Sequence, residues 1–136
     1  MKGTKFVLLV EDDEVDVMSV KRAFSDLNIT NPLYVKDNGE TALQYLLDNN
    51  NALPCLILLD INMPKMGGIE FLKIAKNNPL LKKIPVIIFT TSKEEKDRIE
   101  SFELGIAGYM IKPVNYKQFV DVIKTIHLYW TISELP

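Results

Sequence analysis

One short stretch constrains the fold more than any other, the apolar run at residues 56–59 that ends in Asp60. The run is continuous rather than alternating, and Pro54 and Pro64 bound it. Such a run is typical of a strand buried on both faces, as in a parallel sheet between two layers of helices. In open α/β sheets, ligands bind outside the carboxyl ends of the strands. We therefore expect Asp60 at a ligand-binding edge.

The rest of the chain repeats this pattern of strand and helix. Further apolar runs predict strands at residues 6–10, 33–35, 85–89 and 107–111. Pro32 favours an edge position for the second strand of the chain. Apolar residues at helical spacing follow every strand, between residues 17 and 27, 42 and 47, 69 and 75, 99 and 102, and 119 and 126. Together these segments predict an α/β fold, a doubly wound five-stranded parallel sheet with helices on both faces.

The fourth predicted helix differs from the others because most of its residues are charged. Ser92 and Glu95 have the spacing of a capping box, which predicts the start of this helix. Ile99 and Phe102 are its main apolar residues, and we expect them to anchor it. With so few anchors, the helix is expected to be weakly held and able to move.

Length and composition exclude several classes of protein. The 136 residues predict one domain, and 16 basic against 18 acidic residues give a net charge of −2, which argues against direct binding of nucleic acid. The sequence has no apolar run long enough to span a membrane and no signal-peptide pattern. We therefore expect a cytoplasmic protein that does not bind membranes. Cys55 is expected to be a small apolar filler at the start of the central strand.

Four of the predicted strands end in groups that can do chemistry. These groups are Asp12 and Asp13, then Asp60, then Thr90 and then Lys112. Carboxylates brought close together repel one another unless a cation lies among them, and Mg2+ prefers oxygen ligands of this kind. The set suits phosphoryl transfer, in which Asp60 attacks phosphorus while Lys112 and Thr90 bind the remaining oxygens.

Each of these residues also has an ordinary explanation. Acids after the first strand are common at the start of a helix, where they interact favourably with the helix dipole. Asp60 could be a turn residue before Asn62 and Pro64, and Thr90 or Lys112 alone would be unremarkable. The joint pattern at four strand ends is what indicates a functional site.

The same residues resemble a known family, the receiver domain of response regulators in two-component signalling. The matching motifs are Leu-Leu-Val-Glu-Asp-Asp at residues 8–13, Leu-Leu-Asp-Ile-Asn-Met-Pro-Lys-Met-Gly-Gly at 58–68, Thr90, and Gly-Tyr-Met-Ile-Lys-Pro at 108–113. They cover nearly the whole chain. The resemblance implies a flavodoxin-like (βα)5 fold with strand order 2-1-3-4-5.

The resemblance also implies a site and its cofactor. Asp60 would accept a phosphoryl group from a sensor histidine kinase or phosphotransfer protein. Asp13 and Asp60 would hold Mg2+ together with the backbone carbonyl of Asn62, and Asp12 would act through a bound water molecule. The chain would assist its own phosphorylation and dephosphorylation, without turnover of an external substrate.

Two further pairs of residues take roles from the resemblance. Thr90 and Tyr109 would form a switch: phosphorylation draws the Thr90 hydroxyl inward, and Tyr109 then turns from solvent to a buried position. This movement would reshape the surface of the fourth helix, the fifth strand and the fifth helix. Asn62 and Ser92 would set the lifetime of the phosphorylated state.

A narrower resemblance concerns residues 78–85 and 129–136, which are similar to stand-alone regulators paired with bacterial phytochromes and related sensor kinases. We accordingly expect a single receiver domain over residues 1–136, with a short tail at about 128–136. Tyr129, Trp130 and Ile132 would pack against a second copy or against their own last helix. A homodimer would use this tail or the surface of the fourth helix, fifth strand and fifth helix.

Three other functions compete with this interpretation. A phosphatase of the haloacid dehalogenase class needs a second aspartate two residues after its nucleophile, and Asn62 stands there. A flavodoxin-type module needs a phosphate loop rich in Ser, Thr or Gly after the first strand, where this chain is acidic. A receiver that binds a partner without being phosphorylated stays open as the alternative.

Overall fold

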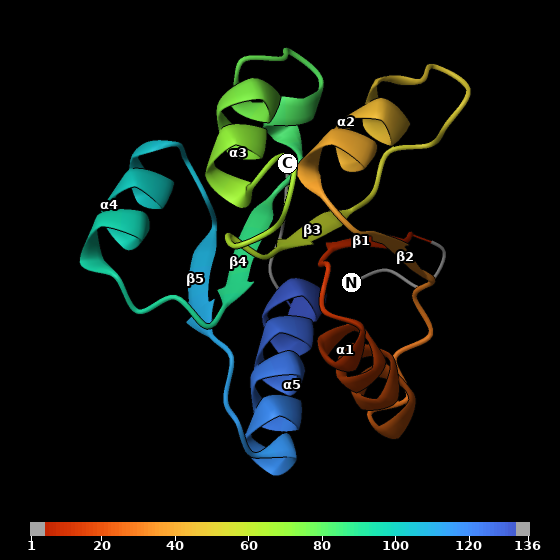
Figure 1. Cartoon of the computed structure of the whole chain (residues 1–136). Helices are drawn as coiled ribbons and strands as arrows, with labels where there is room; N and C mark the ends of the chain where they lie inside the picture. Colours follow the sequence, from red (N-terminus) through yellow and green to blue (C-terminus); the bar gives the residue numbers. More distant parts are fainter. Residues whose placement is uncertain (1–4, 133–136) are drawn as a thin grey trace.

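The computed structural model describes residues 5–132, with side chains through residue 130. Five parallel strands form one sheet in the order β2-β1-β3-β4-β5. Their bounds are Val7–Val10 (β1), Leu33–Lys36 (β2), Leu56–Leu59 (β3), Val86–Thr90 (β4) and Gly108–Ile111 (β5). The predicted doubly wound fold and strand order are confirmed, and β2 lies at an edge as expected (Figure 1).

A helix follows each strand. The helices are α1 (Glu14–Asp26), α2 (Gly39–Leu47), α3 (Gly68–Lys76), α4 (Glu95–Glu103) and α5 (Tyr116–Ile132), with a short 3-10 helix η1 (Leu81–Lys83) before β4. Helices α1 and α5 lie side by side on one face of the sheet, and α2, α3 and α4 cover the other (Figure 1). None of the helices within the described residues has the length and apolar character needed to cross a membrane.

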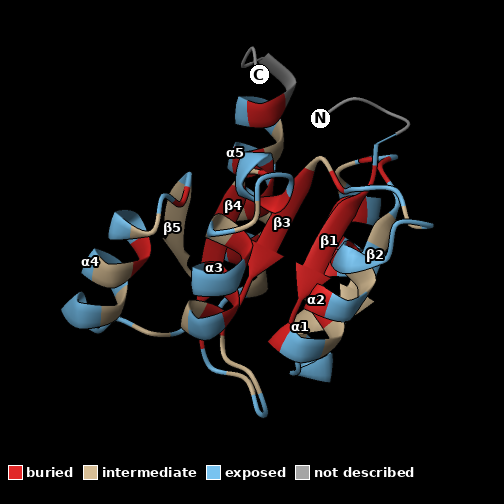
Figure 2. Ribbon diagram, turned by 90° about the horizontal axis from the view of Figure 1, so that it is seen from above, coloured by how far each residue is buried: buried red, intermediate tan, exposed pale blue. Residues whose placement is uncertain are grey.

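The core has two halves, one on each face of the sheet. Strands β1, β3 and β4 are buried along their whole length, which explains why their sequences are continuously apolar (Figure 2). Phe24, Phe119 and Ile123 pack below them from α1 and α5. Phe71 and Leu72 of α3 pack on the opposite face. Each such side chain contributes about 1.5–3 kcal/mol through its burial.

The register of the sheet brings the strand ends to one edge. Val10, the last residue of β1, pairs with Leu59, the last residue of β3. Thr90, the last residue of β4, pairs with Ile111, the last residue of β5. The residues that directly follow these strands therefore converge at the carboxyl edge of the sheet.

The start of α4 differs from the prediction. The helix begins at Glu95, and the residue that caps it, Glu94, makes no side-chain capping hydrogen bond. The predicted capping box of Ser92 and Glu95 is therefore not formed, and that prediction is wrong. Ser92 lies in the preceding loop, and its hydroxyl instead donates a hydrogen bond of 2.7 Å to Oδ2 of Asp97.

The expected anchors of α4 are also wrong. Ile99 and Phe102 are 50% and 51% exposed. The buried residue of this helix is Ser101, whose hydroxyl donates to the backbone carbonyl of Asp97 over 2.7 Å. Figure 2 shows α4 mostly in the exposed colour, in agreement with the expectation of a weakly packed helix.

The end of the chain is partly described. Helix α5 continues to Ile132, so the segment expected as a tail from about residue 128 begins as helix. Trp130 is buried and packs into the core half formed by α1 and α5, while Tyr129 is 55% exposed. The side chain of Ile132 and residues 133–136 lie outside the described residues.

Candidate functional site

Three carboxylates meet at the carboxyl edge of the sheet. Glu11 follows β1 directly, Asp12 comes next, and Asp60 follows β3. One carboxylate oxygen from each lies within 4.8 Å of the other two. Glu11 and Asp60 are buried, whereas Asp12 is exposed. Such a group of hard oxygen ligands is suited to a divalent cation.

The structure does not bring Asp13 into this cluster. Asp13 caps α1, and its Oδ1 atom accepts hydrogen bonds from the backbone N–H groups of Val15 at 2.9 Å and Asp16 at 3.2 Å. The acidic pair at the cluster is thus Glu11 and Asp12, one residue earlier than the predicted pair. The signal for Glu11 is visible in the sequence, because it follows the apolar run of the first strand directly, as Asp60 follows the third.

Asp60 is held firmly by the backbone around it. Its N–H donates to the carbonyl of Val10 over 3.0 Å, and its Oδ1 atom accepts from the N–H of Ile61 over 2.9 Å. The side chain is 7% exposed, so it is nearly withdrawn from water. Asn62 is exposed two residues further on, in the loop between β3 and α3.

Lys112 supplies the positive charge of the site. It follows β5, and its backbone N–H donates to the carbonyl of Thr90 over 2.7 Å. Its ammonium forms ion pairs with Glu11, with Oδ2 of Asp16 at 2.8 Å and with Oδ2 of Asp60 at 3.7 Å. The sequence placed Lys112 near Asp60 correctly, but it did not single out Asp16.

Burial and crowding of like charges shift the proton equilibria of this group. Burial, with a smaller contribution from the charge of Asp60, raises the pKa of Glu11 to about 7, although Lys112 opposes the shift. Burial alone would lower the pKa of Lys112, but the hydrogen bonds to Asp16 and Glu11 raise it above the usual value. The lysine therefore stays charged at neutral pH.

The predicted switch residues lie on β4 and β5, and Ser92, one of the two predicted lifetime residues, lies in the loop between β4 and α4. Thr90, at the end of β4, is fully buried, and its hydroxyl oxygen accepts from the N–H of Ser92 over 3.3 Å. Tyr109, on β5, is half-buried, and its hydroxyl donates to the carbonyl of Ser92 over 3.0 Å. Ser92 thus connects the two predicted switch residues.

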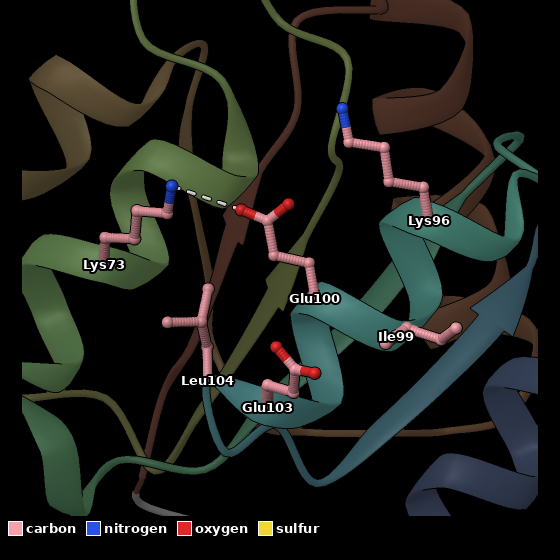
Figure 3. Close-up of a pocket in the computed structure, with 6 residues that line it drawn as sticks. All are labelled: Lys73, Lys96, Ile99, Glu100, Glu103 and Leu104. Carbon is pink, nitrogen blue, oxygen red and sulfur yellow. Dashed lines mark ion pairs between the residues drawn. The ribbon is translucent and has the colours of Figure 1, made fainter.

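A hollow of about 530 Å³ lies elsewhere, between α3 and α4 (Figure 3). Lys73 of α3 and Glu100 of α4 form an ion pair of 3.2 Å across it. Charged side chains of both signs line this hollow, and none of them belongs to the predicted site. The convergent, buried groups are those around Asp60, and they form the candidate functional site.

Comparison with known proteins identifies the family of the chain. The family profile of the response regulator receiver domain matches residues 7–124. Response regulator Rcp1 of Synechocystis sp. is 38% identical over 130 residues, which cover 93% of this chain and 88% of Rcp1.

Two solved structures share both the fold and nearly the full length. The phosphorylated cyanobacterial phytochrome response regulator RcpA has a TM-score of 0.91 at 33% identity, covering 98% of this chain and 99% of RcpA. The Mn2+-bound form of response regulator Rcp1 has a TM-score of 0.90 at 37% identity, covering 97% of this chain and 99% of Rcp1. The resemblance to phytochrome response regulators is thereby confirmed. The chain belongs to the family of response regulator receiver domains, which are modules of two-component signalling rather than enzymes that turn over an external substrate.

Proposed function

We propose that the chain is a single-domain response regulator in which Asp60 accepts a phosphoryl group from a histidine kinase or phosphotransfer protein. One observation carries the proposal: Asp60 is buried between the acidic pair Glu11 and Asp12 and the ammonium of Lys112. Burying several carboxylates next to one another costs stability, and such groups are typical of functional sites. Membership of the receiver family, whose members partner with histidine kinases, supports the same role.

The proposed chemistry uses few protein groups. A carboxylate oxygen of Asp60 attacks phosphorus, the bond from phosphorus to the donor imidazole nitrogen breaks, and the imidazole leaves. Lys112 stabilises the charge on the phosphoryl oxygens from close range in a site with little water. The hydroxyl of Thr90 is proposed to bind one of these oxygens afterwards.

Mg2+ is the proposed cofactor. Glu11, Asp12 and Asp60 would hold it, together with the backbone carbonyl of Asn62. Asp13 is replaced by Glu11 in this set because its carboxylate already caps α1. When bound, the ion supplies positive charge between the carboxylates and the phosphoryl oxygens. The existence of a Mn2+-bound form of Rcp1 supports binding of a divalent cation by this chain.

The output is proposed to pass through Thr90 and Tyr109. A phosphoryl group adds about −1.5 to −2 charge and three acceptor oxygens, enough to draw the hydroxyl of Thr90 toward Asp60. The hydrogen bond from the N–H of Ser92 to the Thr90 hydroxyl would then weaken. Because the Tyr109 hydroxyl donates to the carbonyl of Ser92, the Tyr109 side chain would move as well. Asn62 and Ser92 are proposed to set the lifetime of the phosphorylated state, since both lie two residues beyond a central group of the site.

The surface of α4, β5 and α5 is proposed to bind partner proteins, or a second copy of the chain. Its support is the exposure of Ile99, Phe102 and Tyr129. A single receiver domain over residues 1–136 and a cytoplasmic location complete the proposal, and both stay predictions.

Intact mass measurement after incubation with acetyl phosphate and Mg2+ tests the acceptor. Wild type should gain one phosphoryl group, and Asp60→Asn should gain none while it keeps its fold. Asp26→Asn, an exposed aspartate at the end of α1, is the matched control and should be labelled like wild type. Labelling of Asp60→Asn would place the acceptor elsewhere. If no variant is labelled, with either acetyl phosphate or kinase, the receiver that only binds a partner becomes the better explanation.

A further inference from the structure

The ammonium of Lys112 contacts a carboxylate that no strand end supplies. Glu11 and Asp60 follow strands β1 and β3, whereas Asp16 lies in the first turn of α1. Its Oδ2 atom is 2.8 Å from Nζ of Lys112. Its backbone N–H donates to the capping carboxylate of Asp13 over 3.2 Å. The side chain of Asp16 therefore starts from a capped helix end, which fixes its backbone.

The hydrogen-bond capacity of Lys112 limits what it can do next. A lysine ammonium has three N–H donors. Glu11 and Asp16 each accept one of them. Oδ2 of Asp60, at 3.7 Å, is within ion-pair range but beyond hydrogen-bond distance. Among the described residues, these contacts leave one donor for an oxygen atom that arrives on Asp60.

We infer that Asp16 is a positioning residue, which holds the ammonium of Lys112 far enough from Asp60 to leave room for a phosphoryl group. The inference rests on the proposed phosphorylation of Asp60 and adds a residue to it. Without the Asp16 carboxylate, the ammonium keeps Glu11 as a partner, and Asp60 is the nearest acceptor for the donor that Asp16 releases. The ammonium then moves from ion-pair range to hydrogen-bond distance of Asp60. That hydrogen bond must break before the carboxylate can attack phosphorus.

The surroundings of Asp16 and Lys112 allow the charge of Asp16 to be removed without disturbing the packing. Asp16 and Lys112 both line a hollow of about 270 Å³, with Val15, Val114 and Phe119 among its other walls. Asp16 is 26% exposed at its side chain, so a change of its charge does not open a cavity in the core. Asparagine has the same shape, and Asp16→Asn therefore removes the charge while it keeps the packing.

The position of Asp16 also separates its effect from metal binding. Glu11, Asp12 and Asp60 form the acidic cluster, and Asp16 is not part of it. Loss of Asp16 should therefore change the behaviour of Lys112 while the affinity for Mg2+ changes little.

The test compares wild type, Asp16→Asn, Asp16→Glu and the control Asp26→Asn, which removes one charge from the other end of the same helix. Initial rates of labelling are measured by intact mass over a range of acetyl phosphate concentrations at saturating Mg2+. For Asp16→Asn we expect the rate at saturation to fall about tenfold, as the loss of one charge-assisted hydrogen bond implies. The half-saturating concentration should stay nearly unchanged, and Asp16→Glu should recover part of the rate.

A spectroscopic measurement tests the contact without any phosphorylation. The 15N signal of the Lys112 ammonium should shift in Asp16→Asn and keep its position in Asp26→Asn. An unshifted signal would overturn the inference, as would labelling of Asp16→Asn at the wild-type rate or faster, or an equal loss in Asp26→Asn. Failure of wild type to be labelled at all would instead overturn the proposed function, so the two failures are distinguishable.

Discussion

The hydroxyl of Tyr109 donates a hydrogen bond of 3.0 Å to the backbone carbonyl of Ser92. The N–H of the same residue donates to the hydroxyl of Thr90 over 3.3 Å, and its own hydroxyl donates to Asp97 of α4 over 2.7 Å. One residue of the loop between β4 and α4 therefore contacts both predicted switch residues and the helix beyond them. A change at Thr90 has a short route to the surface of α4.

Removal of the Tyr109 hydroxyl should loosen this loop. Tyr109→Phe keeps the ring and loses only the hydrogen bond to Ser92, for which we expect about 1 kcal/mol of local stability to be lost. Amide hydrogen exchange between Ser92 and Asp97 should then become about fivefold faster. Tyr116→Phe is the control, because the hydroxyl of Tyr116 bonds to Asp26 at the far side of the sheet. Equal exchange in both variants would contradict the connection.

Asp12 and Asp13 should respond differently to substitution, although they are neighbours. Asp12→Asn should weaken binding of Mg2+ in a calorimetric titration, because its carboxylate belongs to the acidic cluster. Asp13→Ala should lose about 1 kcal/mol of unfolding free energy in urea, as expected for the loss of a helix cap. Its affinity for Mg2+ should stay close to that of wild type. The reverse result, with a stable Asp13→Ala that no longer binds Mg2+, would restore Asp13 as a ligand.

The raised pKa of Glu11 should make stability depend on pH when no metal is bound. Burial holds this pKa at about 7 in the folded protein, against a usual value of 4.5. The folded state then binds more protons than the unfolded state between about pH 4.5 and 7, so the free energy of unfolding falls as the pH rises through this window. Urea denaturation in a chelating buffer should show the fall in wild type and in the control Glu40→Gln, whose residue is exposed. Glu11→Gln should flatten it, and an unchanged slope there would contradict the assigned cause.

The parts of the site that strands position are predictable from the sequence. An apolar run that stops at Asp60, and another that stops before Lys112, place both residues at the same edge once the sheet is known to be parallel. Thr90 follows in the same way as the last residue of β4. Strand ends are readable because continuous burial requires continuous apolar sequence.

The parts of the site that helices and loops position are not predictable from the sequence. A row of four acidic residues at 11–14 does not reveal which of them follows the strand directly and which caps the helix. The two acids that lie beside Asp60 are Glu11 and Asp12, one residue before the predicted pair. Asp16 reaches Lys112 from a helix, where acidic residues are common for other reasons. Ser92 and Glu95 have the spacing of a capping box, but the Ser92 hydroxyl donates its hydrogen bond to the side chain of Asp97 instead. In each case tertiary contacts, which the local sequence does not show, determine the role of the side chain.

Gly68 should be as sensitive as the carboxylates, because it sets how closely α3 approaches the loop after Asp60. A Cβ atom at this position would overlap the backbone oxygen of Asp60 and would lie 2.9 Å from Cα of Ile61. Backbone atoms cannot move aside easily, so Gly68→Ala should lose about 1–3 kcal/mol in urea denaturation even though alanine favours helices.

The same displacement should slow labelling of Asp60 by acetyl phosphate, since its carboxylate would move relative to Lys112. Gly108→Ala is the matched control, because a Cβ atom there would have its nearest neighbour, on the Ile87 side chain, at 3.8 Å. We expect that control to keep both its stability and its labelling rate. If Gly68→Ala is as stable and as quickly labelled as Gly108→Ala, the close approach of α3 does not position Asp60.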